Sequence, residues 1–575
     1  MEFADWLGWP LRRRVAQLLV VRASGFLLDG QIRYPVWEPT RDRLRHLVQT
    51  EGVGGVILLG ASAPELALRT AELQSWARSG DFGEHSAGIP LLLAADVEEG
   101  VGQRFAGGTW FPPLMALGEI ARTDCDRAIA LAQGMGAAIA GECRAVGLNW
   151  LLGPVVDVNN NPDNPVINVR AFGETPEVVA DLAAAFVAGA RSGGVLTAAK
   201  HFPGHGDTAT DSHLELPVID HGNDRLQSLE LVPFRRAIAA GVDAVMSAHL
   251  QIPAWDREYP ATLSRAILTD RLRHQLRFGG LIVTDALVMG AIANRYGAQD
   301  APLLALEAGA DILLMPADPS GAIAAIIEAV ETGRVGEDRI NESLGRIWRA
   351  KRHLGLLDAG QASAGAAAVA NDLSETLATQ KSVDLAAAIA VQSNRSGNGV
   401  LTYGSATDSA RSPAGLRLAG EDAVNLGTLA PDAPPDGAQN LILLDDALSA
   451  DMLGQHTPAI ALPRQWGFSR LTLIDRASPD GDELMKTLGD RPTLLQLFVR
   501  GNPFRGSANA ADRAIACYET LVRRDRLLAL LIYGSPYLLD RLRPNCPYVF
   551  SYSQTPQAQA IALATLNPAA PRAKC

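Results

Sequence analysis

The amino-acid sequence predicts an α/β protein, with a (β/α)8 TIM-type barrel followed by a smaller α/β sandwich domain. Three features indicate this fold class. At 575 residues the chain is too long for a single hydrophobic core. Short apolar runs alternate with longer helix-like segments as far as Leu357, as in barrels built from repeated strand–helix units. After a segment of small residues, the same alternation resumes with fewer strands.

Eight apolar runs are the candidate strands of the barrel. They are mostly unbroken stretches of Val, Leu, Ile and Ala, as expected of parallel strands that are covered on both faces. Eight strand-then-helix units in roughly 350 residues fit a closed barrel better than an open sheet. No Gly-x-Gly-x-x-Gly follows an early strand, which argues against a nucleotide site. The candidate strands are Leu18–Arg22, Gly55–Leu59, Pro90–Asp96, Leu151–Val158, Leu196–His201, Ala244–His249, Leu281–Asp285 and Asp311–Met315.

The barrel domain is predicted to span residues 1–357 and the sandwich domain residues 373–575. Residues 358–372, DAGQASAGAAAVAND, are rich in Ala and Gly and weakly patterned, which is typical of a linker. The dense loop FVRGNPFRG, residues 498–506, fits a structural turn better than a binding site. The candidate strands after the linker are Val400–Tyr403, Asn440–Leu444, Leu494–Phe498, Leu528–Tyr533 and Val549–Tyr552.

Charge and composition exclude several kinds of partner. The formal net charge of −12 argues against binding to nucleic acid, and no run of Lys and Arg contradicts this. No apolar stretch is long enough to span a bilayer, and the N-terminal segment lacks the extended apolar core of a signal peptide. The five cysteines are sparse and unclustered, as expected of reduced thiols. We therefore expect a soluble, cytoplasmic protein.

Polar residues stand at the carboxyl ends of several predicted barrel strands. They are Asp96, Asp157, the pair Lys200–His201, His249 and Asp285. In a barrel these strand ends converge on one mouth, where catalytic residues lie. Asp285, in GGLIVTDALVMG, is either such a residue or the N-cap of a helix. Because its position follows a buried strand, the catalytic interpretation is favoured.

The densest polar segment is KHFPGHGDTATDSHLELP, Lys200 to Pro217. Its histidines and aspartates fit two chemistries. They could hold a divalent ion, as in many barrel hydrolases. Alternatively, Asp211 and His213 are two residues apart, so a turn can aim the carboxylate at one ring nitrogen and favour the imidazolium. Such a histidine is a usable proton donor near neutral pH. The segment alone leaves both interpretations open.

These segments together resemble the glycoside hydrolase family 3 β-N-acetylglucosaminidases of the bacterial peptidoglycan-recycling type. KHFPGHGDTATDSHLELP is the most specific feature. The resemblance implies that Asp285 is the nucleophile of a retaining double displacement and that Asp211 and His213 form the acid/base dyad, with no metal and no cofactor. It also implies an accessory role for the sandwich domain. The sugar-binding residues that it implies are Asp96, Arg104, Arg170, Lys200 and His201.

The implied partner is a small β-N-acetylglucosaminide such as a peptidoglycan fragment, bound by a monomer or a homodimer. One segment departs from the family pattern, which reads roughly Gln-Glu-Gly-Gly-Arg-Val-Gln-Arg-Phe after the first aspartate. Here residues 97–105 read VEEGVGQRF, so that Glu99 replaces a glycine and Val101 an arginine. Sugar specificity near this loop is therefore open. The alternatives are a β-glucosidase, a phosphorylase with the same dyad, a metal-dependent barrel hydrolase, and a sugar-binding protein without catalysis.

Overall fold

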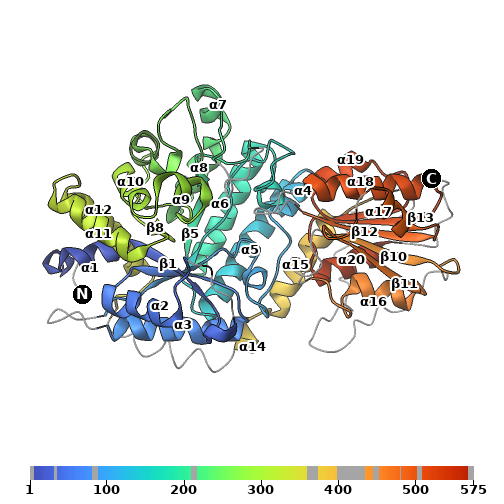
Figure 1. Cartoon of the computed structure of the whole chain (residues 1–575), viewed down its shortest axis with the longest axis horizontal. Helices are drawn as coiled ribbons and strands as arrows, with labels where there is room; N and C mark the ends of the chain where they lie inside the picture. Colours follow the sequence, from blue (N-terminus) through green and yellow to red (C-terminus); the bar gives the residue numbers. More distant parts are fainter. Residues whose placement is uncertain are drawn as a thin grey trace. The chain divides into compact units, whose positions relative to one another are not determined.

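The computed structural model describes residues 5–31, 35, 37–80, 88–208, 216–358, 373–397, 434–444, 452–479, 481–500 and 508–566. The chain forms two compact units, Met1–Ala386 and Ala387–Cys575 (Figure 1). The domain limits drawn from the sequence stay a prediction. Residues 359–372 of the predicted linker lie outside the described residues.

The first unit is built on a sheet of eight strands in the order β7-β6-β5-β4-β3-β2-β1-β8. All of its ladders are parallel. Each predicted strand overlaps an observed one, and the predicted barrel is confirmed. The strands are β1 Leu19–Ser24, β2 Gly55–Leu59, β3 Leu92–Ala95, β4 Trp150–Leu151, β5 Leu196–Phe202, β6 Ala244–Ser247, β7 Leu281–Val283 and β8 Leu313–Leu314.

The strands β7 and β8 stand at the two ends of the sheet order, and the barrel closes between them without the ladder of paired residues that joins its other neighbouring strands. One isolated bridge joins Val283 and Ile312. The backbone N–H of Thr284 donates to the carbonyl of Ile312 at 3.1 Å. The N–H of Leu314 donates instead to the side-chain Oγ1 of Thr284 at 2.9 Å. The sheet is thus nearly closed, and a hydroxyl group completes this seam.

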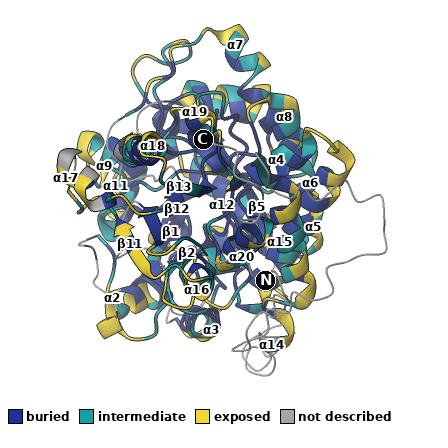
Figure 2. Cartoon of the chain, turned by 90° about the vertical axis from the view of Figure 1, so that its right-hand side faces the viewer, coloured by how far each residue is buried: buried dark blue, intermediate teal, exposed yellow. Residues whose placement is uncertain are grey.

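Helices surround the barrel sheet, so that the strands are buried and the outer faces of the helices are exposed (Figure 2). The long helix α5 buries Leu131, Met135 and Ile139, which lie four residues apart on one face. The α-helices are α1 Leu11–Ala16, α2 Arg41–His46, α3 Ala63–Arg78, α4 Met115–Ala121, α5 Cys125–Ala145, α6 Pro176–Ser192, α7 Asn223–Ser228, α8 Leu231–Ala239, α9 Gly290–Tyr296, α10 Asp300–Ala308, α11 Pro319–Glu331 and α12 Glu337–His353. A π-helix, Ala266–Gln275, lies between β6 and β7 in the chain. After α12 follow α14 Leu373–Thr376 and α15 Gln380–Ser393, which extends past Ala386.

The second unit contains a six-stranded sheet in the order β11-β10-β12-β13-β14-β9. Its ladders are parallel except for the antiparallel edge strand β9. Helices lie on both faces of the sheet, with α17, α18 and α19 on one side and α16 and α20 on the other (Figure 1). The elements are β9 Arg395–Gly397, β10 Gln439–Leu444, α16 Pro458–Gln465, β11 Arg470–Ile474, α17 Gly481–Leu488, β12 Thr493–Val499, α18 Ala508–Arg523, β13 Leu527–Gly534, α19 Pro536–Leu542, β14 Tyr548–Ser551 and α20 Pro556–Thr565.

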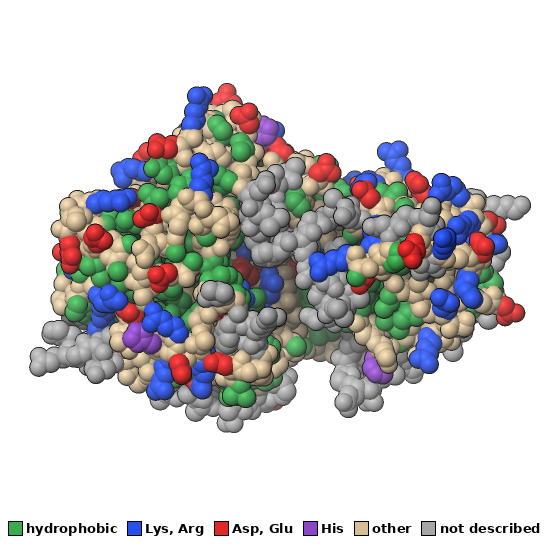
Figure 3. All heavy atoms as spheres, viewed as in Figure 1, with side chains coloured by type: hydrophobic (Ala, Val, Ile, Leu, Met, Phe, Trp, Pro, Cys, Tyr) green, Lys and Arg blue, Asp and Glu red, His purple; other side chains and the backbone are tan. Residues whose placement is uncertain are grey.

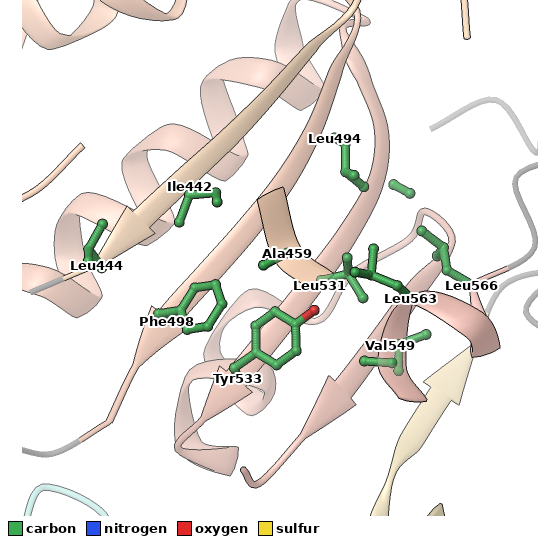
Figure 4. Packing of buried hydrophobic residues seen from close by; sticks show 12 residues of the cluster. Ile442, Leu444, Ala459, Leu494, Phe498, Leu531, Tyr533, Val549, Leu563 and Leu566 are labelled. Carbon is green, nitrogen blue, oxygen red and sulfur yellow. The ribbon is translucent and has the colours of Figure 1, made fainter. Parts of the chain in front are cut away.

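One face of this second sheet carries a compact apolar core with α16 and α20 (Figure 4). Each central strand contributes side chains that are two residues apart, such as Ile442 and Leu444 of β10, because alternate residues of a strand share a face. The rings of Phe498 and Tyr533 stack at 4.5 Å. The predicted sandwich is therefore confirmed, whereas β9 and β11 were not expected from the sequence. The predicted strand 400–403 lies outside the described residues.

The surface carries charged side chains of both signs. On the face drawn in Figure 3, basic and acidic side chains are interspersed. None of the helices in the described ranges is long and apolar enough to cross a membrane.

Candidate active site

The carboxyl ends of the barrel strands bring the predicted polar residues to one rim. Asp96 follows β3 directly, and Lys200 and His201 are among the last three residues of β5. His249 follows β6, and Asp285 follows β7, each after one intervening residue. Because all these strands run parallel, their ends lie at the same end of the barrel.

A buried cluster of charges occupies the rim between β3 and β5. Lys200 Nζ lies 2.8 Å from Asp96 Oδ1 and 2.6 Å from Glu98 Oε1. Glu98 also binds Arg170 with both carboxylate oxygens, at 2.8 and 2.9 Å. Burial opposes the charge of Glu98, but Arg170 and Lys200 hold the pKa of Glu98 well below its ordinary value. Four charged side chains are therefore joined in one network of ion pairs.

The cations of this network stay charged despite their burial. Desolvation lowers the pKa of Lys200, but the carboxylates of Asp96 and Glu98 outweigh it and the net shift is upward. The pKa of Arg170 is raised in the same way, with Glu98 as the main partner opposing desolvation. Arg104 is exposed, and its Nε donates to the backbone carbonyl of Asp96 at 3.0 Å. The structure thus brings four of the predicted sugar-binding residues together.

Asp157, which is fully buried, orients the fifth of these residues, His201. His201 Nδ1 lies 2.8 Å from Asp157 Oδ2. The backbone N–H groups of His201 and His205 donate to Asp157 Oδ1 at 3.1 and 2.7 Å. Burial raises the pKa of Asp157, but His201 and His205 bring it below its ordinary value. An ionised carboxylate at Nδ1 leaves Nε2 as the ring nitrogen of His201 that can face a ligand.

His205 is held as a neutral side chain. Burial, followed by the charge of His201, lowers the pKa of His205 to about 4, while Asp157 and Asp285 act more weakly in the opposite direction. Its Nδ1 lies 2.9 Å from Thr208 Oγ1. The contacts of His205 therefore stabilise the conformation of the segment that follows β5.

The segment after β7 places Asp285 at the rim with its backbone held from two sides. Asp285 Oδ1 accepts a hydrogen bond from the N–H of Ala286 at 2.8 Å. His249 Nε2 lies 3.1 Å from the carbonyl oxygen of Ala286, and His249 Nδ1 lies 2.8 Å from Thr262 Oγ1. Asp285 is partly exposed, whereas Thr284 before it is fully buried. A carboxylate at this position can reach a ligand in the mouth.

Asp211 and His213 lie outside the described residues. Of the other residues in the predicted metal pattern, His201 contacts Asp157, His205 contacts Thr208, and Asp207 contacts His221. In the described part of the chain, which leaves out residues 209–215, no group of three or more His, Cys, Asp or Glu side chains is arranged to hold a metal ion.

Comparison with known proteins assigns the chain to a family. A model of the glycosyl hydrolase family 3 N-terminal domain matches residues 10–350. The chain belongs to glycosyl hydrolase family 3. A second model, of the bacterial family 3 C-terminal domain, matches residues 434–567. Both units of this family 3 protein thus have counterparts in the family.

Two curated relatives are similar to about half of this family 3 chain. A β-hexosaminidase A of Pseudoalteromonas piscicida is 36% identical over 337 residues, which cover 54% of this chain and 55% of the relative. A β-N-acetylglucosaminidase/β-glucosidase of Cellulomonas fimi is 32% identical over 323 residues, which cover 54% of each. The chain therefore spans about half the length of these relatives.

A solved structure is similar over nearly the whole of both chains. The family 3 β-N-acetylglucosaminidase of Paenibacillus sp. str. FPU-7 superposes with a TM-score of 0.76 and 29% identity, and the match covers 98% of each chain. The barrel and the second sheet are thus both found in a solved family 3 structure.

Two polar residues of the site were not predicted as part of it. Glu98 binds Lys200 and Arg170, which are distant in sequence. Asn164 Nδ2 donates to the carbonyls of His205 and Gly206, both at 2.9 Å, and so ties the segment before Arg170 to the segment after β5. The position of Glu98 so close to Asp96 was the available signal, whereas no local pattern distinguishes Asn164.

Proposed function

We propose that this family 3 protein is a retaining, exo-acting β-N-acetylhexosaminidase that removes terminal β-linked N-acetylglucosamine. The observation that carries the proposal is the buried cluster of Lys200, Glu98 and Arg170 at the rim that also bears Asp285. Retaining glycosidases need a carboxylate nucleophile beside groups that bind the sugar hydroxyls. The names of the C. fimi and Paenibacillus proteins support the choice of N-acetylglucosamine, and that of the P. piscicida protein supports a hexosaminidase.

In this proposal five residues bind the terminal sugar. Lys200, Arg104 and Arg170 donate hydrogen bonds to its oxygens, and Asp96 accepts from its hydroxyl groups. His201 contributes Nε2, because Asp157 engages its Nδ1. Charged hydrogen bonds of this kind are stronger than neutral ones and are well suited to fix a sugar in one orientation.

The proposed chemistry is a double displacement. The Asp285 carboxylate attacks the anomeric carbon while the bond to the leaving oxygen breaks, and the protonated His213 gives its proton to that oxygen. A covalent glycosyl ester with Asp285 results. His213 then takes a proton from water, the water oxygen attacks the anomeric carbon, and Asp285 leaves as a carboxylate. Asp211 stabilises the imidazolium of His213, which is present before the first step and again after the second. This scheme requires no metal and no organic cofactor.

A second candidate is a β-glucosidase, which the name of the C. fimi relative favours. Phosphorolysis is a variant of the same chemistry. A histidine that has given up its proton carries no charge, whereas a carboxylate acid/base would be anionic and would repel phosphate. The peptidoglycan fragment as natural substrate, the cytoplasmic location and the state as a monomer or homodimer stay predictions.

Paired aryl substrates test the proposal. We expect a much higher kcat/KM for an aryl N-acetyl-β-glucosaminide than for the matching aryl β-glucoside, and a β-configured first product. Faster turnover of the glucoside would favour the second candidate. Inorganic phosphate in the assay should leave the product as free sugar; a sugar 1-phosphate would indicate a phosphorylase. Activity that is lost with a chelator and restored by zinc would contradict the double displacement without metal.

A further inference from the structure

Two adjacent glutamates at the barrel mouth have different partners. Glu98 and Glu99 are both almost completely buried, at 2% and 1% exposure. Glu98 contacts the two buried cations Lys200 and Arg170. Glu99 Oε2 accepts from the indole N–H of Trp110 at 3.0 Å, and the Glu99 backbone N–H donates to Gln103 Oε1. Both glutamates lie in the turn that the N–H of Gly100 closes on the carbonyl of Val97 at 3.1 Å.

Glu98 is the group that the two cations share. Its Oε1 lies 2.6 Å from Lys200 Nζ and 2.8 Å from Arg170 Nη2, while its Oε2 lies 2.9 Å from Arg170 Nε. The Glu98 side chain is 3% exposed, whereas the Asp96 side chain is 33% exposed. Asp96 therefore faces the mouth, and Glu98 lies behind the cations.

We propose that Glu98 is a positioning residue, which fixes Lys200 and Arg170 so that they and Asp96 present one rigid set of groups to the sugar. This inference rests on the proposed function. Glu98 itself does not touch the substrate. It carries the negative charge that two adjacent buried cations need, because a buried charge without a counter-charge is strongly unfavourable.

Substitution of Glu98 by glutamine keeps the shape and removes the charge. The single amide oxygen can serve one cation, while the amide N–H groups face the other. Lys200 then depends on Asp96 alone, and the Asp96 carboxylate is drawn from the sugar towards the ammonium. A displacement of this kind lowers catalysis steeply, so the kcat/KM of Glu98→Gln should fall on the order of 100-fold.

Glu99→Gln is the matched control. The substituted glutamine retains an oxygen that can accept from Trp110 Nε1, and it removes the same charge from the same buried segment. Its kcat/KM should stay within about twofold of the unsubstituted protein. Glu98→Asp keeps the charge but shortens the side chain, so its kcat/KM should lie between those of the two glutamine variants. Similar losses in Glu98→Gln and Glu99→Gln would overturn the proposal.

A second measurement does not depend on activity. The chain has only five lysines, so the Lys200 ammonium can be followed in the full-length protein by NMR of 13C-labelled lysine, with Lys200→Arg for assignment. Asp96, Glu98 and Arg170 are the charged groups that face Lys200. Glu98→Gln should lower the pKa of Lys200 by about one unit or more, because one of two carboxylates is lost. Glu99→Gln and Glu98→Asp should leave it nearly unchanged.

The two measurements separate the two hypotheses. A protein that cleaves no N-acetyl-β-glucosaminide but shows the Lys200 shift only in Glu98→Gln would contradict the proposed function and support the role of Glu98. An active enzyme in which Glu98→Gln leaves both kcat/KM and the Lys200 resonance unchanged would contradict the role of Glu98 alone.

Discussion

His221 Nε2 lies 2.7 Å from Asp207 Oδ2, and Arg225 Nη2 lies 3.0 Å from the same oxygen. Asp207 precedes residues 209–215 in the chain and His221 follows them. The contact therefore joins the two sides of the connection between β5 and α7, which contains Asp211 and His213. Burial raises the pKa of Asp207, but the hydrogen bond from His221 and further partners bring it below its ordinary value.

The first prediction concerns this contact. Asp207→Asn should slow the hydrolysis of glycosides with poor leaving groups more than that of activated aryl glycosides, because the proposed proton donor lies between the joined ends. Stability should fall by less than about 1 kcal/mol, since the pair is partly exposed. Leaving-group series and thermal unfolding measure the two effects. Asp224→Asn, in the exposed first turn of α7, is the control, and an equal effect of both variants would refute the prediction.

The pH dependence of the same pair has a definite sign. The folded-state pKa of Asp207 lies below the value of about 3.9 in an unfolded chain. Its contribution to stability is therefore fully present above that unfolded value and is lost as the pH falls through the folded pKa. The difference in Tm between the unsubstituted protein and Asp207→Asn should accordingly vanish in acid.

The second prediction concerns Asp285. Asp285→Asn should lower kcat by roughly 1,000-fold or more, because an amide is not a nucleophile. Its side-chain oxygen can still accept from the N–H of Ala286 as Asp285 does, so Tm should change little. A steady-state assay with an activated aryl N-acetyl-β-glucosaminide provides the test. Retention of one tenth of the activity would be incompatible with nucleophilic attack by Asp285.

The third prediction concerns His213. His213→Ala should affect substrates with poor leaving groups far more than activated aryl substrates, since only the former need a proton to depart. With an activated substrate, loss of the base for the second step should also let the glycosyl–enzyme accumulate. Intact-protein mass spectrometry should then detect one added sugar residue, which Asp285→Asn should never show. Equal losses on both substrate types would instead indicate that His213 positions the substrate.

The fourth prediction concerns Lys351, a lysine of α12 that is 0% exposed. Its Nζ donates to Gln17 Oε1 at 2.9 Å, and burial lowers the pKa of Lys351 to about 7. Between about pH 7 and pH 10 the unfolded chain binds a proton at this residue that the folded chain releases. Stability should therefore rise with pH across this window.

Unfolding midpoints of the unsubstituted protein and of Lys351→Met, measured from pH 6.5 to 9.5, test this dependence. Lys351→Met should reduce the rise of the unfolding free energy with pH, by at most about 1.4 kcal/mol per pH unit. Lys381→Met, at an exposed position in α15, is the control and should keep the slope. Parallel curves for all three proteins would rule out the assignment.

The strands could be predicted where both of their faces are buried, because such strands consist almost entirely of apolar residues. Parallel strands covered on both faces are continuous apolar runs, and β2 was predicted with its observed limits. β4 was predicted too long, because Pro154 has no N–H for the ladder and only an isolated bridge at Val155 continues the pairing. β11 begins with two exposed residues and alternates thereafter, and β9 is short and polar. Neither forms an apolar run that could reveal it.

The site could be predicted in part, for a topological reason. Parallel strands of a barrel end at one rim, so that Asp96, Lys200 and Asp285 were expected near each other without knowledge of any contact. The partner of a charged group cannot be derived in this way. The role of Glu98 depends on side chains from β5 and from the segment around Arg170, which only the folded chain brings within reach.

At the seam between β7 and β8, Thr284 has a structural role and takes no part in the proposed reaction. Its hydroxyl is the acceptor for the Leu314 N–H, where another strand would offer a carbonyl. Valine at this position would fill the same space but leave that buried donor unsatisfied in the chain segment next to Asp285. The backbone conformation around the proposed nucleophile thus depends on the Thr284 side chain, and removal of its single hydroxyl oxygen should alter that conformation.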